Sequence, residues 1–335
     1  MNALAGEPRD QGSDGGMRRV GSEYEFVTHD LDRVIRRRRD DVPAAHEDDP
    51  APGWPVPGDA SALHCEQWHG FSDPDELTYG GYVTRQDEAG TIVHGVLDYY
   101  DRAAHDLMLG PDWLEALGEL FAPLRYPLYG LQRVESYLGV VAPTSNVVNA
   151  AAFATTDLVR ATSVVALRTR QLQVRHPTRS FAARDRAVWQ DMPAWQPARR
   201  AVETALEATD FGEALTAVNL VLWPALEAVL FRSFGQVARA NGDGLTWLLL
   251  ATLANDAERN RRWSTALARY AVQQRPANEA VFGRWAGRWA PRAAAAVESL
   301  AAAIADLPRA MSASDITEAA DEAVGETLAS TRVGA

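Results

Sequence analysis

The sequence predicts an all-α fold, a bundle of long helices, and two stretches of the chain carry this prediction. Residues 142 to 176 place apolar side chains at spacings of three, four and seven, the pattern of one stripe along a helix. The members of this stripe are Val147, Ala151, Ala154, Leu158, Ala161, Val165 and Leu172. A similar stripe recurs in residues 245 to 274. A helix of about seven or eight turns needs neighbours of similar length, so a bundle is implied.

Before the bundle, the chain is expected to form an extended, partly disordered N-terminal arm. Residues 1 to 20 are rich in Gly, Asp, Arg and Ser, residues 21 to 29 alternate as a short extended segment, and residues 42 to 60 hold five prolines. Aromatic residues then gather in a segment broken by Pro and Gly. They are either anchors on a partner surface or part of this chain's own packing. The candidate interface residues are Tyr24, Phe26, Trp68, Phe71, Tyr79 and Tyr82.

The remaining chain divides into predicted helices that follow one another with short breaks. An arm over residues 1–90 leads into a helical domain over 91–310, and a C-terminal helix or tail covers 311–335. Helices are expected over residues 91–110, 111–121, 124–141, 142–176, 198–208, 210–240, 245–274, 278–306 and 312–330. Ser145 or Asn146 can cap the helix of 142–176, and Asp210 can cap the helix of 210–240. Pro224 is expected to kink the latter.

Charge and cysteine content exclude several classes of protein. The net charge of -12 and the pI of about 5.1 argue against a nucleic-acid binder. The run Arg36 to Arg39 is therefore better explained as a solvated or interface-bound cluster. The longest apolar runs, 214–231 and 245–254, are interrupted or too short to span a bilayer, so no membrane is expected. A single cysteine, Cys65, rules out an internal disulfide and fits a soluble cytoplasmic protein.

Two of the long helices carry the same Asp-x-x-Arg segment, 99 residues apart. Asp157 and Arg160 lie in the first, and Asp256 and Arg259 lie in the second. One hypothesis places all four side chains in an ion-pair cluster at the centre of the bundle, because a buried unpaired charge would cost several kcal/mol. The alternative is that each Asp pairs with the Arg three residues later on the surface of its own helix.

Two helices with this segment at this separation resemble the ferritin-like carboxylate bundle and, within it, the hydroxylase subunits of soluble diiron monooxygenases. In the catalytic alpha subunits of that family the segment is Asp-Glu-x-Arg-His, and its Glu and His bind iron. This sequence holds Leu158 and Ala257 at the Glu positions, and Ala161 and Asn260 at the His positions. The residues from Phe71 to Glu88 also resemble the junction between arm and bundle. The departure suggests the beta, or small, subunit, which shares the bundle without its diiron site.

The count of possible ligands leads to the same expectation without the resemblance. A diiron site in a bundle takes a Glu from each of two helices and Glu-x-x-His from each of two others. The chain has seven His, and none follows His176. The resemblance would place the first ligand Glu near Tyr126 or Pro127, and Glu135 lies nearby. One carboxylate makes no dimetal site, so Glu135 is expected to be solvated or ion-paired. We expect no metal ligands and no cofactor in this chain.

The resemblance implies a structural subunit of an NAD(P)H-dependent multicomponent enzyme that uses O2 to hydroxylate or epoxidise small hydrocarbons. Diiron is expected in the alpha subunit, which would bind this chain as αβ or (αβ)2. A regulatory or coupling protein and a reductase or ferredoxin are the further partners implied. Two alternatives are a ferritin-like oxidase with its own degenerate metal site and a helical scaffold unrelated to oxygenases. The sequence does not select the hydrocarbon substrate.

Overall fold

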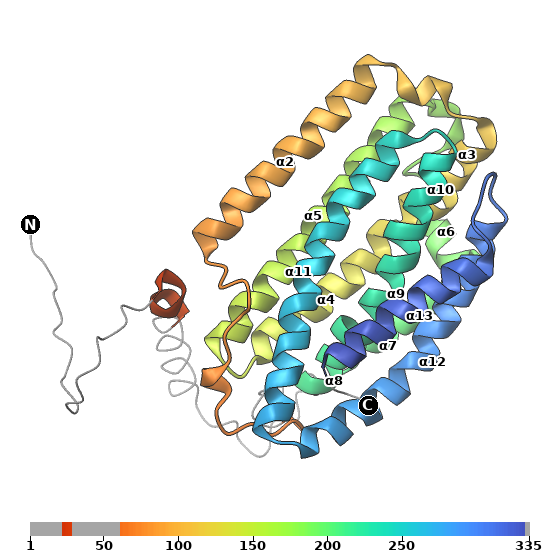
Figure 1. The fold of residues 1–335 in the computed structure, drawn as a ribbon. Helices are drawn as coiled ribbons and strands as arrows, with labels where there is room; N and C mark the ends of the chain where they lie inside the picture. The colour runs from red at the N-terminus through yellow and green to blue at the C-terminus, as the bar shows by residue number, and fades with distance from the viewer. Residues whose placement is uncertain (1–21, 29–60, 332–335) are drawn as a thin grey trace, which may run out of the picture.

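The computed structural model describes residues 22–28 and 61–331, and every regular element in these ranges is a helix. Four long helices form the bundle: α4 (Arg125–Val141), α5 (Ser145–Arg175), a helical run from Phe211 to Ala240, and α11 (Gly244–Gln274). Figure 1 shows α2 (Tyr79–Arg102), α5 and α11 running side by side along the bundle. On another side, α12 (Ala277–Ala305) and α13 (Ala313–Ser330) pack against the third long helix and each other.

Shorter helices connect these elements at the ends of the bundle. They are η2 (Trp68–Gly70), η3 (His105–Met108), α3 (Pro111–Ala116), η4 (Leu117–Phe121), η5 (Ala122–Leu124), η6 (Pro177–Arg179), α6 (Asp185–Asp191), η7 (Pro193–Trp195) and α7 (Gln196–Ala205). His105, which we expected on a long helix, lies in the η3 turn instead. Ala104, just before it, has a φ of 50°, so the helical direction breaks there.

Side-chain caps fix where several of the helices begin. Asp210 accepts hydrogen bonds from the backbone N–H groups of Gly212 and Glu213, as expected, and Asp243 accepts from Thr246 at the start of α11. Thr144, rather than Ser145 or Asn146, stands at the N-cap of α5, and its side chain makes no capping bond. The start of α5 is instead tied to the arm, because the Ser145 hydroxyl donates to the carbonyl of Thr28 at 2.7 Å.

The third long helix is continuous, but its hydrogen-bond pattern changes from α-helical to π-helical in two segments. It consists of α8 (Phe211–Leu215), the π-helical segment η8 (Thr216–Leu222), α9 (Trp223–Glu227), the π-helical segment η9 (Ala228–Ser233) and α10 (Phe234–Ala240). Pro224 lies between the two π-helical segments and has no N–H to donate. The wider turns accommodate it without ending the helix, which explains the disturbance that the sequence predicted at this position.

The arm is shorter and more helical than the sequence suggested. The first long helix begins at Tyr79 and not at residue 91, and residues 23–28, predicted as extended, form a short helix. Thr78 sets the earlier start, because its side chain accepts the N–H of Gly81. The expectations for residues 1–20, 36–39 and 42–60 lie outside the described residues.

Surface and core are clearly separated in the described part. The two segments long and apolar enough to cross a bilayer are Ser145–Arg175 and Phe211–Ala240; the apolar window of the second is 100% buried within the fold, as in the core helix of a bundle. The window of the first is only 50% buried.

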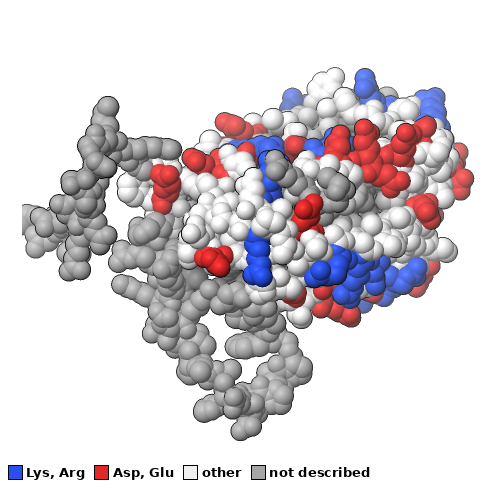
Figure 2. Space-filling view, turned by 60° about the horizontal axis from the view of Figure 1, so that its bottom comes forward, with Lys and Arg blue, Asp and Glu red and all other residues white. Residues whose placement is uncertain are grey.

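On the face drawn in Figure 2, acidic and basic side chains gather in separate patches with uncharged surface between them. The C-terminal helix α13 docks through Ile316, Ala320 and Thr327, so it is not a frayed tail.

Candidate functional site

The Asp and Arg residues of the two Asp-x-x-Arg segments meet in the centre of the bundle. Arg259 donates to Asp157 through Nη2 and, at 3.2 Å, through Nε, and Arg160 Nη1 donates to Asp256 Oδ2 at 2.5 Å. Both pairs join α5 to α11, because on antiparallel helices the first residue of one segment lies level with the last residue of the other. The side chains of the four are 1% to 15% exposed, so none points into solvent. We name these four residues the ion-pair centre.

Helix α2 adds two hydrogen-bond donors to the ion-pair centre. The Tyr82 hydroxyl donates to Asp157 Oδ1 at 2.8 Å, while its ring stacks on Phe153 with centroids 4.4 Å apart. Gln86 Nε2 donates to the same oxygen at 2.9 Å and lies 3.4 Å from Asp256 Oδ1, so it links the two ion pairs. Sequence analysis missed this role of both residues. Their spacing of four, on one face of a helix, was the available signal.

Burial dominates the electrostatics of the ion-pair centre. It raises the pKa of Asp157 to about 6, although the Arg259 guanidinium acts in the opposite direction. Burial and the neighbouring Asp157 carboxylate raise the pKa of the Tyr82 hydroxyl well above its ordinary value, so Tyr82 remains a proton donor. The centre is therefore a structural tie between three helices and offers no free base or nucleophile.

The four positions that the resemblance equates with iron ligands lie around one small cavity beside the ion-pair centre. Leu158 and Ala161 face Ala257 and Asn260 across it, and Trp223 and Phe231 belong to its wall. Its space of about 10 Å³ holds at most about one water. The resemblance equated these four positions with the ligands of a diiron site, and in this fold all four line the same cavity.

The polar side chain among the four positions is already engaged within the protein. Asn260 Nδ2 donates to Asn219 Oδ1 at 2.9 Å, and Asn260 Oδ1 accepts from Trp263 Nε1 at 2.5 Å. Leu and Ala offer no donor atom, and the nearby Asp157 and Asp256 are neutralised by arginines. These residues do not fit a diiron site. Within residues 22–28 and 61–331, no group of three or more His, Cys, Asp or Glu is arranged to hold a metal ion.

Glu135 is the residue for which the sequence expectation was wrong. It is neither solvated nor ion-paired: its exposed fraction is 0%, and neither carboxylate oxygen has a partner at hydrogen-bonding distance and angle. Burial raises its pKa to about 8, although the nearby amides of Asn219 and Asn260 oppose this. Glu135 therefore carries its proton at neutral pH. Its spacing of four and seven from Leu131 and Leu128 placed it on the buried stripe of α4, a signal that we overlooked.

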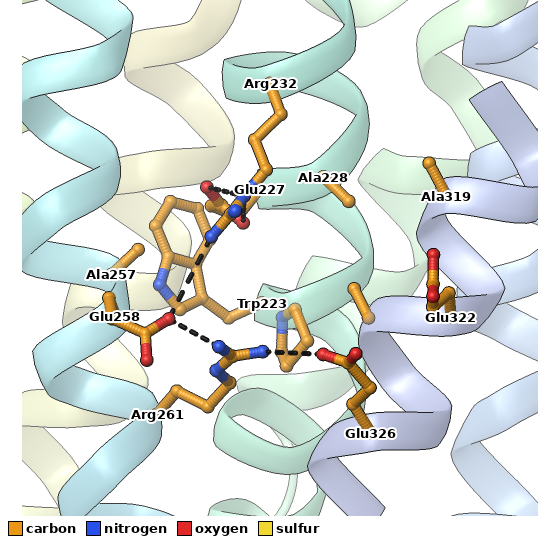
Figure 3. A pocket seen from close by; sticks show the side chains of 12 residues that line it. Trp223, Glu227, Ala228, Arg232, Ala257, Glu258, Arg261, Ala319, Glu322 and Glu326 are labelled. Carbon is orange, nitrogen blue, oxygen red and sulfur yellow. Dashed lines mark hydrogen bonds and ion pairs between the residues drawn. The ribbon is translucent and has the colours of Figure 1, made fainter.

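A surface groove lies on the outer side of the same cavity (Figure 3). It measures about 300 Å³, runs between the third long helix, α11 and α13, and shares Trp223 and Ala257 with the cavity wall. Glu227 accepts from Arg232 Nε at 2.9 Å on this side. Arg261 lies 2.5 Å from Glu258 and 3.5 Å from Glu326. These carboxylates are held in ion pairs.

A second buried polar cluster ties the far end of the bundle and was not predicted. Arg168 on α5 forms a two-pronged pair with Asp106, with both N–O distances at 2.7 Å. Asp243 accepts from Trp113 Nε1 at 3.0 Å and lies 3.2 Å from His105 Nε2. Although burial favours the neutral acid, these hydrogen bonds lower the pKa of Asp243 to about 2. Asp106 and His105 come from the η3 turn, so sequence periodicity gave no signal for this cluster.

The six aromatic interface candidates divide into two groups. Tyr24, Trp68, Phe71 and Tyr82 are buried within this chain. Trp68 packs edge-on against Phe211, for example, with ring centroids 6.2 Å apart. Tyr24, Trp68 and Phe71 anchor the arm and Tyr82 belongs to α2, so we withdraw all four as interface residues. Phe26 and Tyr79 are 61% and 73% exposed and remain candidates.

Comparison with known proteins identifies the family. The family model described as methane/phenol/alkene hydroxylase matches residues 45–275. The hydroxylase component beta subunit of the toluene-4-monooxygenase system of Ectopseudomonas mendocina is 33% identical over 284 residues, which cover 84% of this chain and 86% of the relative. The hydroxylase component small subunit of propane 2-monooxygenase from Rhodococcus jostii (strain RHA1) is 28% identical over 73% of this chain and 67% of its own length.

A solved structure gives the same result. A chain from toluene 4-monooxygenase, with toluene bound in the resting active site, superposes with a TM-score of 0.78 at 32% identity, covering 87% of this chain and 98% of that chain. The chain therefore belongs to the methane/phenol/alkene hydroxylase family, as a beta, or small, subunit of the hydroxylase component of a multicomponent monooxygenase.

Proposed function

We propose that this chain is the non-catalytic subunit of its hydroxylase and that the chemistry resides in a catalytic alpha subunit that holds diiron. The complete enzyme would use O2 and electrons from NAD(P)H to hydroxylate or epoxidise a small hydrocarbon in the cytoplasm. Electrons would arrive through a reductase or ferredoxin, and a regulatory protein would control the reaction. The chain itself binds no cofactor in this proposal.

One observation carries the proposal. The four positions that would supply Glu and His ligands hold Leu158, Ala161, Ala257 and Asn260, and they surround a space with room for about one water. The carboxylates next to that space are paired with arginines from the opposite helix. This interior supports a role in which the chain keeps its helices at fixed positions while the metal lies in another subunit.

The role of the chain's residues is to hold the scaffold. The ion-pair centre joins α5 to α11, and Gln86 and Tyr82 attach α2 to both. At the far end of the bundle, the Arg168–Asp106 ion pair links α5 to η3. A reaction centre requires its residues to stay within a fraction of an ångström of their productive positions. A rigid subunit packed against the catalytic subunit would help to hold them there.

Iron analysis of the separated and combined subunits tests the proposal. We expect far less than one iron per chain in this chain alone, and iron with hydrocarbon oxidation in the complex with the alpha subunit. Asn260→Ala serves as the matched control: it should leave the iron content of the folded complex unchanged, because Asn260 is not a ligand. Two irons in this chain alone, or a loss of iron from the Asn260→Ala complex, would contradict the proposal.

A further inference from the structure

The solvent-facing side of α5 has an unusual composition. Its exposed residues are Ala152, Thr156, Val159, Ser163, Leu167, Arg170, Val174 and Arg175. Arg175 ends the helix and pairs with Asp101 at 2.6 Å, so Arg170 carries the single charge along the rest of the face. The exposed side of a surface helix in a globular protein normally carries many charged residues. Apart from Arg170, this side of α5 carries apolar residues or small ones (Ala, Ser and Thr) from Ala152 to Val174.

The neighbouring helix α4 extends this uncharged surface. Its exposed residues are Tyr129, Arg133 and Val140, of which Tyr129 is 56% and Val140 is 67% exposed. The two helices are in close contact, since a Cβ built on Gly139 would lie 3.8 Å from the side chain of Ala151. We name the exposed residues of α4, together with those of α5 from Ala152 to Val174, the α4–α5 face.

Another exposed helix of the same chain shows that this composition is not general. The exposed positions of α13 include Asp315, Glu318, Asp321, Glu322 and Glu326, all acidic. The two helices come from one sequence with a net charge of -12, yet the exposed residues of the α4–α5 face include no acidic residue. Its two charges, Arg133 and Arg170, are both positive. The difference indicates that α13 faces water and that the α4–α5 face is covered in the working protein.

We propose that the α4–α5 face is the surface on which the catalytic subunit of the hydroxylase docks; this inference rests on the proposed function. Its size agrees with a stable contact. From Ala152 to Val174 the face is roughly 33 Å long at about 1.5 Å per residue. The exposed residues of α4 run from Tyr129 to Val140, roughly 17 Å at the same rise, so α4 borders only about half of that length. With each helix about 10 Å wide, the face measures roughly 500 Å² and would form the greater part of the ~800 Å² that each partner contributes to a standard stable interface.

Charge favours a different chain over a second copy of this one as the occupant. In a dimer of this chain the α4–α5 faces of the two copies would meet, and the only charges on both faces are arginines. Each copy also has a net charge of -12. Both features oppose self-association. The partner that fits has a flat apolar helical face with carboxylates opposite Arg133 and Arg170. Val159 and Leu167, which are 46% and 42% exposed, lie in the middle of the face and are the residues to substitute.

Binding of charge-inserted variants to the catalytic subunit tests the inference. The double variant Val159→Arg/Leu167→Arg should bind tagged catalytic subunit at least about 100-fold more weakly than the unmodified chain, because two unpaired charges would be buried. Ile92→Arg is the matched control, since Ile92 is an apolar residue, 58% exposed, on the separate helix α2. It should bind within about threefold of the unmodified chain. Thermal unfolding by circular dichroism confirms that all chains are folded.

Each other outcome has a distinct meaning. If the unmodified chain does not bind the catalytic subunit, the proposed function fails. If it binds and the double variant binds equally well, or if Ile92→Arg is the variant that loses binding, the docking surface has been placed wrongly. A concentration-dependent dimer of the chain alone that the double variant abolishes, seen by sedimentation, would assign the face to a second copy. A lower melting temperature of the isolated double variant would indicate that other residues of this chain cover it.

Discussion

The two faces of α5 each depart from the usual distribution of polarity along a helix: charged residues lie among the apolar residues of its buried side, and apolar residues lie on its exposed side. Its buried side holds Asp157 and Arg168, while its exposed side shows Val159, Leu167 and Val174. The buried charges are tolerated because each meets an opposite charge from another element: Arg259 on α11 or Asp106 in η3. Within residues 22–28 and 61–331, no other element covers these exposed apolar residues. The comparison teaches that a charged residue can be stable in the core when it has a charged partner there. An apolar residue on the surface likewise has to be judged by what binds that surface.

The two faces also differ in what the free chain requires of them. Removing one member of a buried pair leaves a charge without compensation, so the inner face should be sensitive to substitution in the chain alone. Single apolar residues on a surface are common and cost the isolated fold little. The outer face should therefore matter only in the presence of a partner. Four substitution experiments test this difference, in decreasing order of expected effect.

The largest effect is expected from Arg259→Leu. Arg259 is 1% exposed and is the arginine that neutralises Asp157. Its removal leaves a buried carboxylate without its charge partner and should lower the free energy of unfolding by about 3–5 kcal/mol. Urea unfolding followed by circular dichroism measures this. The double variant Asp157→Leu/Arg259→Leu is the control and should recover much of the loss. Equal losses in both variants would show that packing, rather than charge, causes the effect.

Glu135 on α4 should make stability depend on pH. Its pKa is raised to about 8 in the fold from 4.5, so the folded chain binds this proton more tightly than the unfolded chain. The free energy of unfolding should therefore fall as pH rises from about 5 to 8, by about 2–4 kcal/mol for this group. The groups that face it are Asn219, Asn260, Arg259 and Asp157.

Glu135→Gln isolates this contribution, because the amide resembles the protonated acid and does not titrate. The variant should have similar stability to the unmodified chain near pH 5.5 and greater stability at pH 9, as measured by urea unfolding at each pH. Part of the slope should remain in the variant, since burial also raises the pKa of Asp157. Identical pH profiles for the two chains would mean that Glu135 is charged in the fold and has a partner.

Tyr82→Phe should have a smaller effect on the same inner face. It removes the hydroxyl that donates to Asp157 at 2.8 Å but keeps the ring that stacks on Phe153. Asp157 retains its bonds to Arg259 and Gln86, so the loss should be about 1 kcal/mol, typical of one hydrogen bond. Thermal unfolding of the two chains at equal concentration measures it. A loss as large as that of Arg259→Leu would show that α2 detaches as a unit.

Sequence periodicity predicted the parts of the fold that depend on one face of one helix. It gave the bundle and the nine helical stretches, to within a few residues in most cases. It failed where the determinant is local or comes from a distant element. Thr78 starts α2 twelve residues before the predicted helix, and the η3 turn supplies Asp106 to Arg168 through a break in helical direction.

Buried polar residues were the other source of error. The spacing of Glu135 places it on the buried apolar stripe of α4. Because a carboxylate is normally exposed or paired, it was instead predicted to be solvated or ion-paired. Tyr82 and Gln86 were not assigned to the ion-pair centre, because their helix was predicted to begin after them and their spacing of four was therefore not read as one helix face. The Asp-x-x-Arg segments identified the residues that meet, but only the antiparallel packing of α5 and α11 shows that the pairs form between helices.

The smallest effect on the free chain is expected from Val159→Arg, on the outer face of α5. Val159 is 46% exposed, and a long charged side chain there can extend into water. The free energy of unfolding should change by less than about 0.5 kcal/mol, as for most surface substitutions. Arg259→Leu, one helix inward, should cost several times more in the same urea measurement. If instead Val159→Arg destabilised the isolated chain by more than about 2 kcal/mol, its face would already be buried by this chain. The contrast between the inner and outer faces of α5 would then disappear, and with it the reason to place a second subunit there.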